Sequence, residues 1–298
     1  MYTSFFGLVK KPFSLTPDPE FLYLSPNHKK ALTVLKYGLM SQAGFTVITG
    51  AIGAGKTTLV RHILNTIDEE STAGLISNTH TAFGDLLTWV LSAFSIEHDC
   101  RNKAERYQKF VEFVQKEWQK QRRVILIVDE AQNMELQTLE ELRLLSNINV
   151  GQDAVLQIVL VGQPELLTKL QAPELVQFAQ RVSVGFNLSP LNFQETKKYI
   201  YYRLLIAGGS TQLFTPSACS AIYYFTTGVP RLINNICDLS LLYAFAEDEK
   251  IVSLQTVIEV IKEKKIGGIT PLDGRKGKAY EEIRKNILEK DKIDLEVI

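Results

Sequence analysis

The sequence is poor in the residues that build disulfide frameworks and metal centres. Its three cysteines, Cys100, Cys219 and Cys237, are odd in number, far apart and outside any C-x-x-C pair. Neither a disulfide scaffold nor a zinc site is therefore indicated. The four histidines are also dispersed, without carboxylates or cysteines at ligand spacing. We expect reduced thiols in the cytoplasm and no transition metal.

Long apolar runs, a basic amino-terminal region and an excess of one charge are missing as well. The run around Leu239–Ala246 is far shorter than the roughly 20 residues that span a bilayer, and the first six residues carry no basic side chain. We expect a cytoplasmic protein, peripheral to the inner membrane only through a partner. Lysine plus arginine and aspartate plus glutamate number 33 each. Nothing in the net charge indicates a nucleic-acid partner, although a local basic patch could still bind one.

The 298 residues, 45% of them hydrophobic, suffice for one large α/β domain and a smaller second domain. Short runs rich in β-branched residues predict five buried strands. Apolar residues at helical spacing, clearest from Tyr107 to Trp118, lie between them. This alternation predicts a largely parallel sheet flanked by helices. The expected strands are 45–49, 74–77, 124–128, 155–161 and, more weakly, 182–188.

After Pro190 the pattern becomes helical only. Asn192 with Glu195 forms a capping box, Pro216 stands at a first helical position, and Ser253 precedes a third apolar run. We predict an α/β domain with an amino-terminal arm over 1–190 and a helical lid over 191–264. The glycine- and proline-rich start of 265–298 predicts a flexible charged tail ending in a short helix, and a frayed terminus and a docking helix fit it about equally.

The segment Gly50–Thr57, GAIGAGKT, matches the phosphate-binding pattern G-x-x-x-x-G-K-[ST] between a predicted strand and a helix. Glycines let backbone N–H groups close around phosphates, Lys56 reaches the β- and γ-phosphates, and Thr57 binds Mg²⁺. The segment predicts an ATP and Mg²⁺ site. Its predicted nucleotide-binding residues are Gly50, Ala51, Ile52, Gly53, Ala54, Gly55, Lys56, Thr57 and Thr58.

Two carboxylates, Asp129 and Glu130, end the apolar strand 124–128. Ligands bind at the carboxyl ends of strands in open α/β sheets. With the phosphate-binding loop earlier in the chain, the pair predicts that Asp129 holds the metal and Glu130 activates the attacking water. The sequence therefore predicts an ATPase.

Three further polar residues are candidates for the same chemistry. Gln163 follows the fourth strand, and its amide could touch the γ-phosphate or the water if that strand lies beside the phosphate-loop strand; a helix-capping role is equally open. Arg181 and Arg231 are candidates for stabilising transition-state charge.

These residues resemble those of AAA+ ATPases of the general secretion pathway protein A (ExeA-like) family, including relatives linked to exosortase and polysaccharide-export loci. The resemblance covers residue 2 to about residue 264. Beyond the phosphate-binding loop it is carried by Phe6-Gly7-Leu8, Lys11-Pro12-Phe13, Pro17-Asp18-Pro19, Phe21-Leu22-Tyr23-Leu24-Ser25, Asp129-Glu130-Ala131-Gln132, Gly162-Gln163-Pro164-Glu165-Leu166, Gln180-Arg181-Val182 and Gly228-Val229-Pro230-Arg231.

The resemblance implies roles for the three polar candidates. Gln163 resembles the sensor-1 position, although Asn or Thr is commoner there; Arg181 resembles a finger that completes a neighbour's site, and Arg231 a sensor-2 arginine on the lid. An arginine finger that acts on the site of a neighbouring subunit implies a homo-oligomer, usually a ring. The first 25 residues would lie beside the adenine, or form an aromatic arm packed on the core. Secretion members commonly continue into a membrane span and a peptidoglycan-binding domain, whereas we expect this chain to act on an envelope machine through a separate membrane partner.

The function that follows is an oligomeric AAA+ ATPase that energises assembly or regulation of a secretion, pilus or exopolysaccharide machine. Its expected partner is a cytoplasmic or membrane protein of that envelope system. The alternative is a DNA-associated AAA+ regulator of the transposition or replication type, which the neutral charge disfavours. A scaffold that binds ATP but scarcely hydrolyses it is a third hypothesis, and Glu130 argues against it.

Overall fold

The chain separates into two compact units in the computed structural model, which describes residues 1–16, 18–41, 44–67, 70–77, 79, 84–97, 99–150, 153–266 and 277–298. The first, here named the α/β unit, comprises Pro26–Ile52 and Lys56–Ser189. The second, here named the helical unit, comprises Met1–Ser25, Gly53–Gly55 and Pro190–Ile298.

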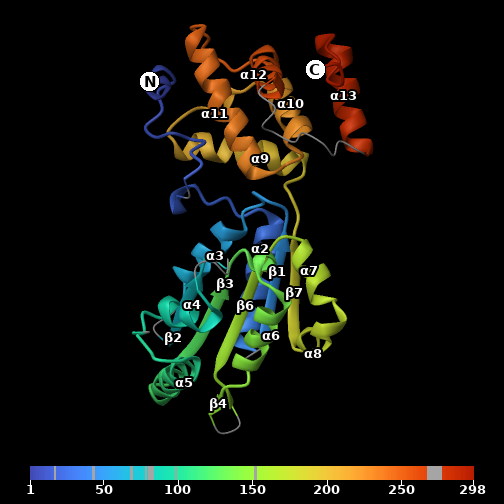
Figure 1. The fold of residues 1–298 in the computed structure, drawn as a ribbon. Coiled ribbons are helices and arrows are strands. Elements are labelled where there is room, and N and C mark those ends of the chain that lie inside the picture. Colours follow the sequence, from blue (N-terminus) through green and yellow to red (C-terminus); the bar gives the residue numbers. More distant parts are fainter. Residues whose placement is uncertain are drawn as a thin grey trace. The chain divides into compact units, whose positions relative to one another are not determined.

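The α/β unit is built on one parallel sheet of five strands in the order β2-β3-β6-β1-β7 (Figure 1). Its strands are β1 (Phe45–Gly50), β2 (Ser71–Ile76), β3 (Arg123–Val128), β6 (Leu156–Gly162) and β7 (Val182–Leu188). Every residue of β1 and β6 is buried, as expected for central strands covered on both faces. The sheet flanked by helices confirms the predicted fold class, and each strand falls within a few residues of its predicted range.

Helices precede and connect these strands. They are α2 (Pro26–Met40), α3 (Lys56–Leu64), α4 (Leu86–Ala93), α5 (Lys103–Gln119), η3 (Ala131–Asn133), α6 (Leu136–Leu145), α7 (Glu165–Leu170), η4 (Pro173–Leu175) and α8 (Val176–Ala179). A separate antiparallel sheet of two strands, which the sequence did not predict, precedes β6. Its strands are β4 (Asn149–Val150) and β5 (Asp153–Ala154).

Because the strands pair in parallel, their carboxyl ends lie at the same edge of the sheet. Thr49 pairs with Gly162, and Val128 pairs with Leu160 and with Ile76. The residues that follow β1, β3 and β6 therefore meet at this carboxyl edge. The opposite, amino edge is where β7 begins.

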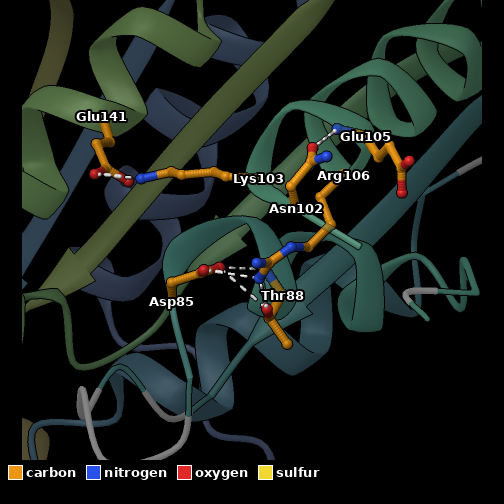
Figure 2. A network of polar contacts seen from close by, with 7 residues as sticks. All are labelled: Asp85, Thr88, Asn102, Lys103, Glu105, Arg106 and Glu141. Atoms are coloured by element: carbon orange, nitrogen blue, oxygen red, sulfur yellow. Dashed lines mark hydrogen bonds and ion pairs between the residues drawn. The ribbon is translucent and has the colours of Figure 1, made fainter. Parts of the chain in front are cut away.

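Polar contacts join α4, α5 and α6 on one flank of the α/β unit (Figure 2). Asp85 caps α4 by accepting hydrogen bonds from the N–H and hydroxyl of Thr88, and its second oxygen pairs with Arg106 of α5 at 2.7 Å. Lys103 of α5 pairs with Glu141 of α6, also at 2.7 Å. Burial acts to raise the pKa of Asp85, but the Thr88 hydrogen bonds and Arg106 outweigh it, and the pKa is lowered overall.

Replacing Asp85 with alanine is expected to destabilise the α/β unit by about 0.5–2 kcal/mol, the usual cost of losing a helix cap. Because the folded pKa lies below the unfolded value of about 3.9, this stabilisation is present above that value and disappears as pH falls through the folded pKa. Urea unfolding followed by tryptophan fluorescence measures it, since both tryptophans, Trp89 and Trp118, lie in this unit. The exposed Asp99, changed to alanine, serves as the control. A pH-independent difference between wild type and variant would contradict the carboxylate's role.

The helical unit packs around its own core. Its elements are α1 (Tyr2–Phe5), η1 (Pro19–Phe21), α9 (Phe193–Ile206), η5 (Thr211–Leu213), α10 (Pro216–Thr226), α11 (Pro230–Ala246), α12 (Leu254–Ile266) and α13 (Lys278–Asp291). The expected capping box of Asn192 and Glu195 is present, Thr215 caps α10 with Pro216 at its first position, and the Ser253 hydroxyl accepts from the Thr256 N–H.

The amino-terminal arm belongs to the helical unit, whereas the sequence placed it with the α/β domain. Phe6, Phe13 and Phe21 are buried in the core of this unit. The buried Arg203 of α9 donates to the backbone carbonyls of Pro12 and Ser14 and lies over the Phe21 ring. A buried guanidinium needs acceptors for its N–H groups, and these carbonyls tie the arm to α9. The arm's aromatic packing was one of the two expected interpretations, but the domain it packs on differs.

The carboxyl-terminal helix α13 is docked within the helical unit. Tyr280 stacks on Tyr223 of α10 with ring centroids 5.3 Å apart, and Ile283 and Ile287 are buried. Residues 267–276, the glycine-rich part of the predicted flexible tail, lie outside the described residues. Residues 278–291 of the tail thus form a helix with an apolar contact face.

The three cysteines are free thiols. Cys219 of α10 and Cys237 of α11 are buried in the helical unit, whereas Cys100 in the α/β unit is partly exposed. In the part of the chain that the structure describes, no helix combines the length and apolar character needed to cross a membrane.

Candidate nucleotide site

The loop between β1 and α3 requires glycine at several positions. Gly53 and Gly55 have φ of 76° and 100°, in the left-handed region that favours glycine. At Gly50 a Cβ atom would lie 2.6 Å from the carbonyl oxygen of Leu188 in β7. These glycines allow the chain to turn sharply from the strand into the helix. Thr58 is in the first turn of α3, where backbone N–H groups lack intrahelical acceptors and favour anions.

Lys56 is held inside this loop. Its side chain is buried, and Nζ donates to the carbonyls of Gly50 and Ala51 at 2.8 and 3.0 Å. Burial lowers the pKa of Lys56, and nearby carboxylates, Glu130 first, partly oppose that effect. An ammonium has three donors, so two of them orient Lys56 and leave one for a further acceptor. The cation is therefore positioned at the loop as a phosphate-binding lysine requires.

Thr57 and Asp129 come together from α3 and the end of β3. The Thr57 hydroxyl donates to Asp129 Oδ2 at 2.8 Å, and Asp129 is 4% exposed. A hydroxyl and a carboxylate side by side are hard oxygen ligands of the kind Mg²⁺ takes together with waters and phosphates. The two residues predicted as metal ligands thus lie in contact and fit Mg²⁺.

Glu130 adopts a left-handed backbone conformation, φ 53° and ψ 35°. This is an uncommon conformation for a residue other than glycine. Three hydrogen bonds support it: the Thr79 hydroxyl and the Asn133 N–H donate to the Glu130 carbonyl, and the Glu130 N–H donates to Asp129 Oδ1. The sharp turn separates the two carboxylates, with Asp129 at Thr57 and Glu130 directed toward the end of β6.

Gln163 lies directly after β6, which pairs with β1, so the condition set for its proposed role is met. Its side-chain nitrogen is 3.5 Å from Glu130 Oε2, and its backbone N–H donates to Gln132 Oε1 at 3.0 Å. The structure therefore brings Gln163 together with Glu130 at the carboxyl edge.

Arg181 lies at the opposite edge of the sheet, just before β7. Its guanidinium donates to the Arg143 carbonyl at 3.3 Å, to the Ser146 hydroxyl at 3.0 Å and to the Asn147 side-chain oxygen, all at the end of α6. The seven residues of β7 rise by about 3.3 Å each, or about 20 Å in total. Arg181 is thus separated from the carboxyl edge of its own sheet by the whole length of the strand.

Arg231 is the second residue of α11 in the helical unit. Its backbone N–H donates to the carbonyl of Gly53, a residue grouped with the same unit, at 3.4 Å. A Cβ added at Gly53 would come within 2.8 Å of the Arg231 Cβ. Glycine at this loop position therefore leaves space for Arg231.

Sequence reasoning missed two residues that shape the site, Thr79 and Gln132. Gln132 belongs to the motif Asp129–Gln132 that carries the family resemblance, but nothing in the spacing of that motif indicates that the Gln132 amide contacts Glu130. Thr79 has no sequence signal, because its contact depends on the turn at Glu130.

Comparisons with known proteins agree with this fold. Residues 39–170 match a family model described as an AAA domain. Two archaeal structures are similar over most of the chain: the Aeropyrum pernix ORC2 protein in its ADPNP–ADP complexes (TM-score 0.65, 16% identity, 88% of this chain and 73% of that one) and Cdc6p from Pyrobaculum aerophilum (0.66, 16%, 89% and 75%). The Thermotoga maritima RuvB Holliday junction branch migration motor gives a TM-score of 0.54 at 20% identity, over 95% of this chain and 80% of that one. The fold and the site thus define a P-loop ATPase of the AAA+ class.

A curated relative narrows this class. General secretion pathway protein A of Aeromonas hydrophila is 39% identical over 250 residues, which are 83% of this chain and 45% of the relative. The chain is an AAA+ ATPase of the general secretion pathway protein A (ExeA-like) type, as the sequence motifs indicated. It spans slightly less than half the length of that relative.

Proposed function

We propose that the chain binds MgATP at the Gly50–Thr57 loop and hydrolyses it. The observation that carries this proposal is the contact between Thr57 and Asp129, with Glu130 beside it at the same edge. A bound Mg²⁺ would neutralise phosphate charge at Thr57 and Asp129. The Lys56 ammonium would face the β- and γ-phosphates.

Glu130 acts in this proposal as the general base. Its carboxylate takes a proton from a water whose oxygen bonds to the γ-phosphorus, while the bond from that phosphorus to the bridging oxygen of ADP breaks. Gln163 contributes a side-chain amide next to Glu130, in the role of sensor 1. Arg231, on the helical lid, would act as the sensor-2 arginine.

We infer that the active form is a homo-oligomer, and a ring in particular. The location of Arg181 supports this inference: it lies at the amino edge, where it cannot serve the site on its own sheet but is available to a neighbour's site. The 39% identity to general secretion pathway protein A supports a role in energising an envelope machine for secretion, pilus assembly or exopolysaccharide export. The partner would be a protein of that machine, with the ATPase on the cytoplasmic side of the inner membrane.

Replacing Lys56 with alanine tests the nucleotide site. Wild-type protein with Mg²⁺ is expected to release phosphate from ATP, at a rate per protomer that rises with protein concentration if oligomers form. Lys56→Ala should bind ATP more weakly and show no measurable turnover, because the loop loses its only phosphate-directed cation among the described residues 50–58. Phosphate release over a series of protein concentrations measures the turnover, and titration with a fluorescent ATP analogue measures the binding.

The exposed Lys116 of α5, changed to alanine, is the matched control for a lost lysine. A Lys56→Ala variant that hydrolyses ATP like the wild type would contradict the proposed function. Adding duplex DNA at low and high salt tests the DNA-associated alternative, which expects salt-sensitive binding and faster turnover with DNA.

A further inference from the structure

The side chain of Gln132 bridges the two strands that carry the hydrolytic residues. It lies in η3, directly after Glu130, and is buried. Its Nε2 donates to Glu130 Oε2 at 2.6 Å, and its Oε1 accepts from the backbone N–H of Gln163 at 3.0 Å. One amide thus connects the carboxylate after β3 to the backbone after β6.

The orientation of this amide follows from its partners. The Gln163 N–H can only donate, so the amide oxygen must face β6 and the amide nitrogen must face Glu130. A carboxylate that accepts from such a donor makes a charge-assisted hydrogen bond. The contact therefore fixes which oxygen of the Glu130 side chain faces Gln132.

The surroundings of Gln132 keep the amide in place. Lys169 of α7 donates to the carbonyls of Gln132 and Met134 at 2.6 and 2.9 Å, which holds the backbone of η3. Gly162 leaves space for the amide, because a Cβ there would lie 2.9 Å from Gln132 Oε1. The held backbone, the close packing against Gly162 and the two hydrogen bonds of the amide leave the Gln132 side chain few alternative rotamers. Its N–H donor is therefore fixed in space.

We propose that Gln132 is a positioning residue for Glu130. It holds Oε2, the oxygen that the Gln163 amide also approaches, and thereby turns the other carboxylate oxygen toward the attacking water. Through the Gln163 N–H, the same amide makes the orientation of Glu130 depend on the carboxyl end of β6. This inference rests on the proposed ATP hydrolysis and deepens it, since it assigns the residue that sets the geometry of the general base.

Gln132→Met tests the proposal, because methionine keeps the length of the side chain and removes both hydrogen bonds. The variant is expected to lower kcat by about tenfold to a hundredfold, the range that corresponds to losing a hydrogen bond to a charged group. The KM for ATP and the affinity for a fluorescent ATP analogue should stay within about twofold, since the Gln132 side chain bonds to Glu130, Asn133 and Gln163 and not to Lys56, Thr57 or Asp129. The exposed Gln171, changed to methionine, is the matched control.

A double variant separates positioning from general stability. In a Glu130→Gln background, Gln132→Met should cause no additional loss, because residues acting through one group are not additive. A purely structural role predicts instead a further loss as large as the one that Gln132→Met causes in the wild type.

The outcomes distinguish this role from the proposed function itself. If the wild type hydrolyses ATP and Gln132→Met has an unchanged kcat, or loses activity additively with Glu130→Gln, the positioning role is wrong and the ATPase stands. If the wild type has no turnover at any concentration, the proposed function fails and the role of Gln132 fails with it.

Discussion

Glu130→Gln is expected to lower ATP turnover by about 10² to 10⁴, the contribution usual for a general base, while MgATP still binds. The amide has nearly the same shape as the carboxylate but cannot take the proton of the attacking water. The residues that would hold nucleotide and metal keep their contacts without the Glu130 side chain, because Lys56 donates to backbone carbonyls of the loop and Thr57 donates to Asp129. The variant should therefore accumulate as an ATP-bound form.

Single-turnover phosphate release and titration with a fluorescent ATP analogue measure these two expectations separately. Glu174→Gln is a suitable control, because it removes an exposed carboxylate in η4, and it should retain most of the turnover. A Glu130→Gln protein that hydrolyses ATP at the wild-type rate would exclude Glu130 as the base. A protein that no longer binds ATP would show instead that Glu130 supports the nucleotide site.

Arg181→Ala is expected to reduce turnover by about 10³ to 10⁵, the effect of removing an arginine finger, and to leave ATP affinity unchanged. The reason is geometric: Arg181 is at the amino edge of the sheet, and a strand of about 20 Å separates it from its own carboxyl edge. In the proposed role it contributes charge to another copy's site. Phosphate release at protein concentrations where wild-type turnover has reached its plateau measures the loss.

Mixing the Arg181→Ala and Glu130→Gln proteins provides a sharper test of whether Arg181 acts on a neighbouring subunit. Arg181→Ala subunits keep Glu130, and Glu130→Gln subunits keep Arg181, so a mixture should regain activity that neither variant has alone. Asn147→Ala controls for structural effects, because it removes one acceptor of Arg181 but retains the guanidinium. Absence of recovery in mixtures that do co-assemble would exclude the trans finger, and so would full activity of Arg181→Ala.

Local patterns predicted the elements of the α/β unit well. The buried runs at β1, β3 and β6 consist of consecutive apolar residues because both faces of a central parallel strand are covered. The phosphate-binding loop and the carboxylates after β3 were also predictable, because strand, glycines and charged residues lie close together in the sequence. The contact between Thr57 and Asp129 then follows from parallel pairing.

What the sequence could not predict depends on contacts between distant segments. The assignment of the amino-terminal arm is set by the burial of its aromatic residues and by Arg203, about 190 positions later. The docking of α13 depends on Tyr280 meeting Tyr223. The role of Gln132 depends on the left-handed turn at Glu130 and on β6 lying next to β3. None of these contacts follows from a periodic pattern within one segment of the sequence.

The buried cysteines of the helical unit have a chemical consequence. Burial raises the pKa of the Cys219 thiol to about 12 and that of the Cys237 thiol well above its usual range. The thiolate is the species that alkylating reagents attack, so both sulfurs are nearly inert while α10 and α11 stay packed. Their labelling rate then reports the transient opening of that unit. Cys100, in the other unit, provides an accessible reference within the same molecule.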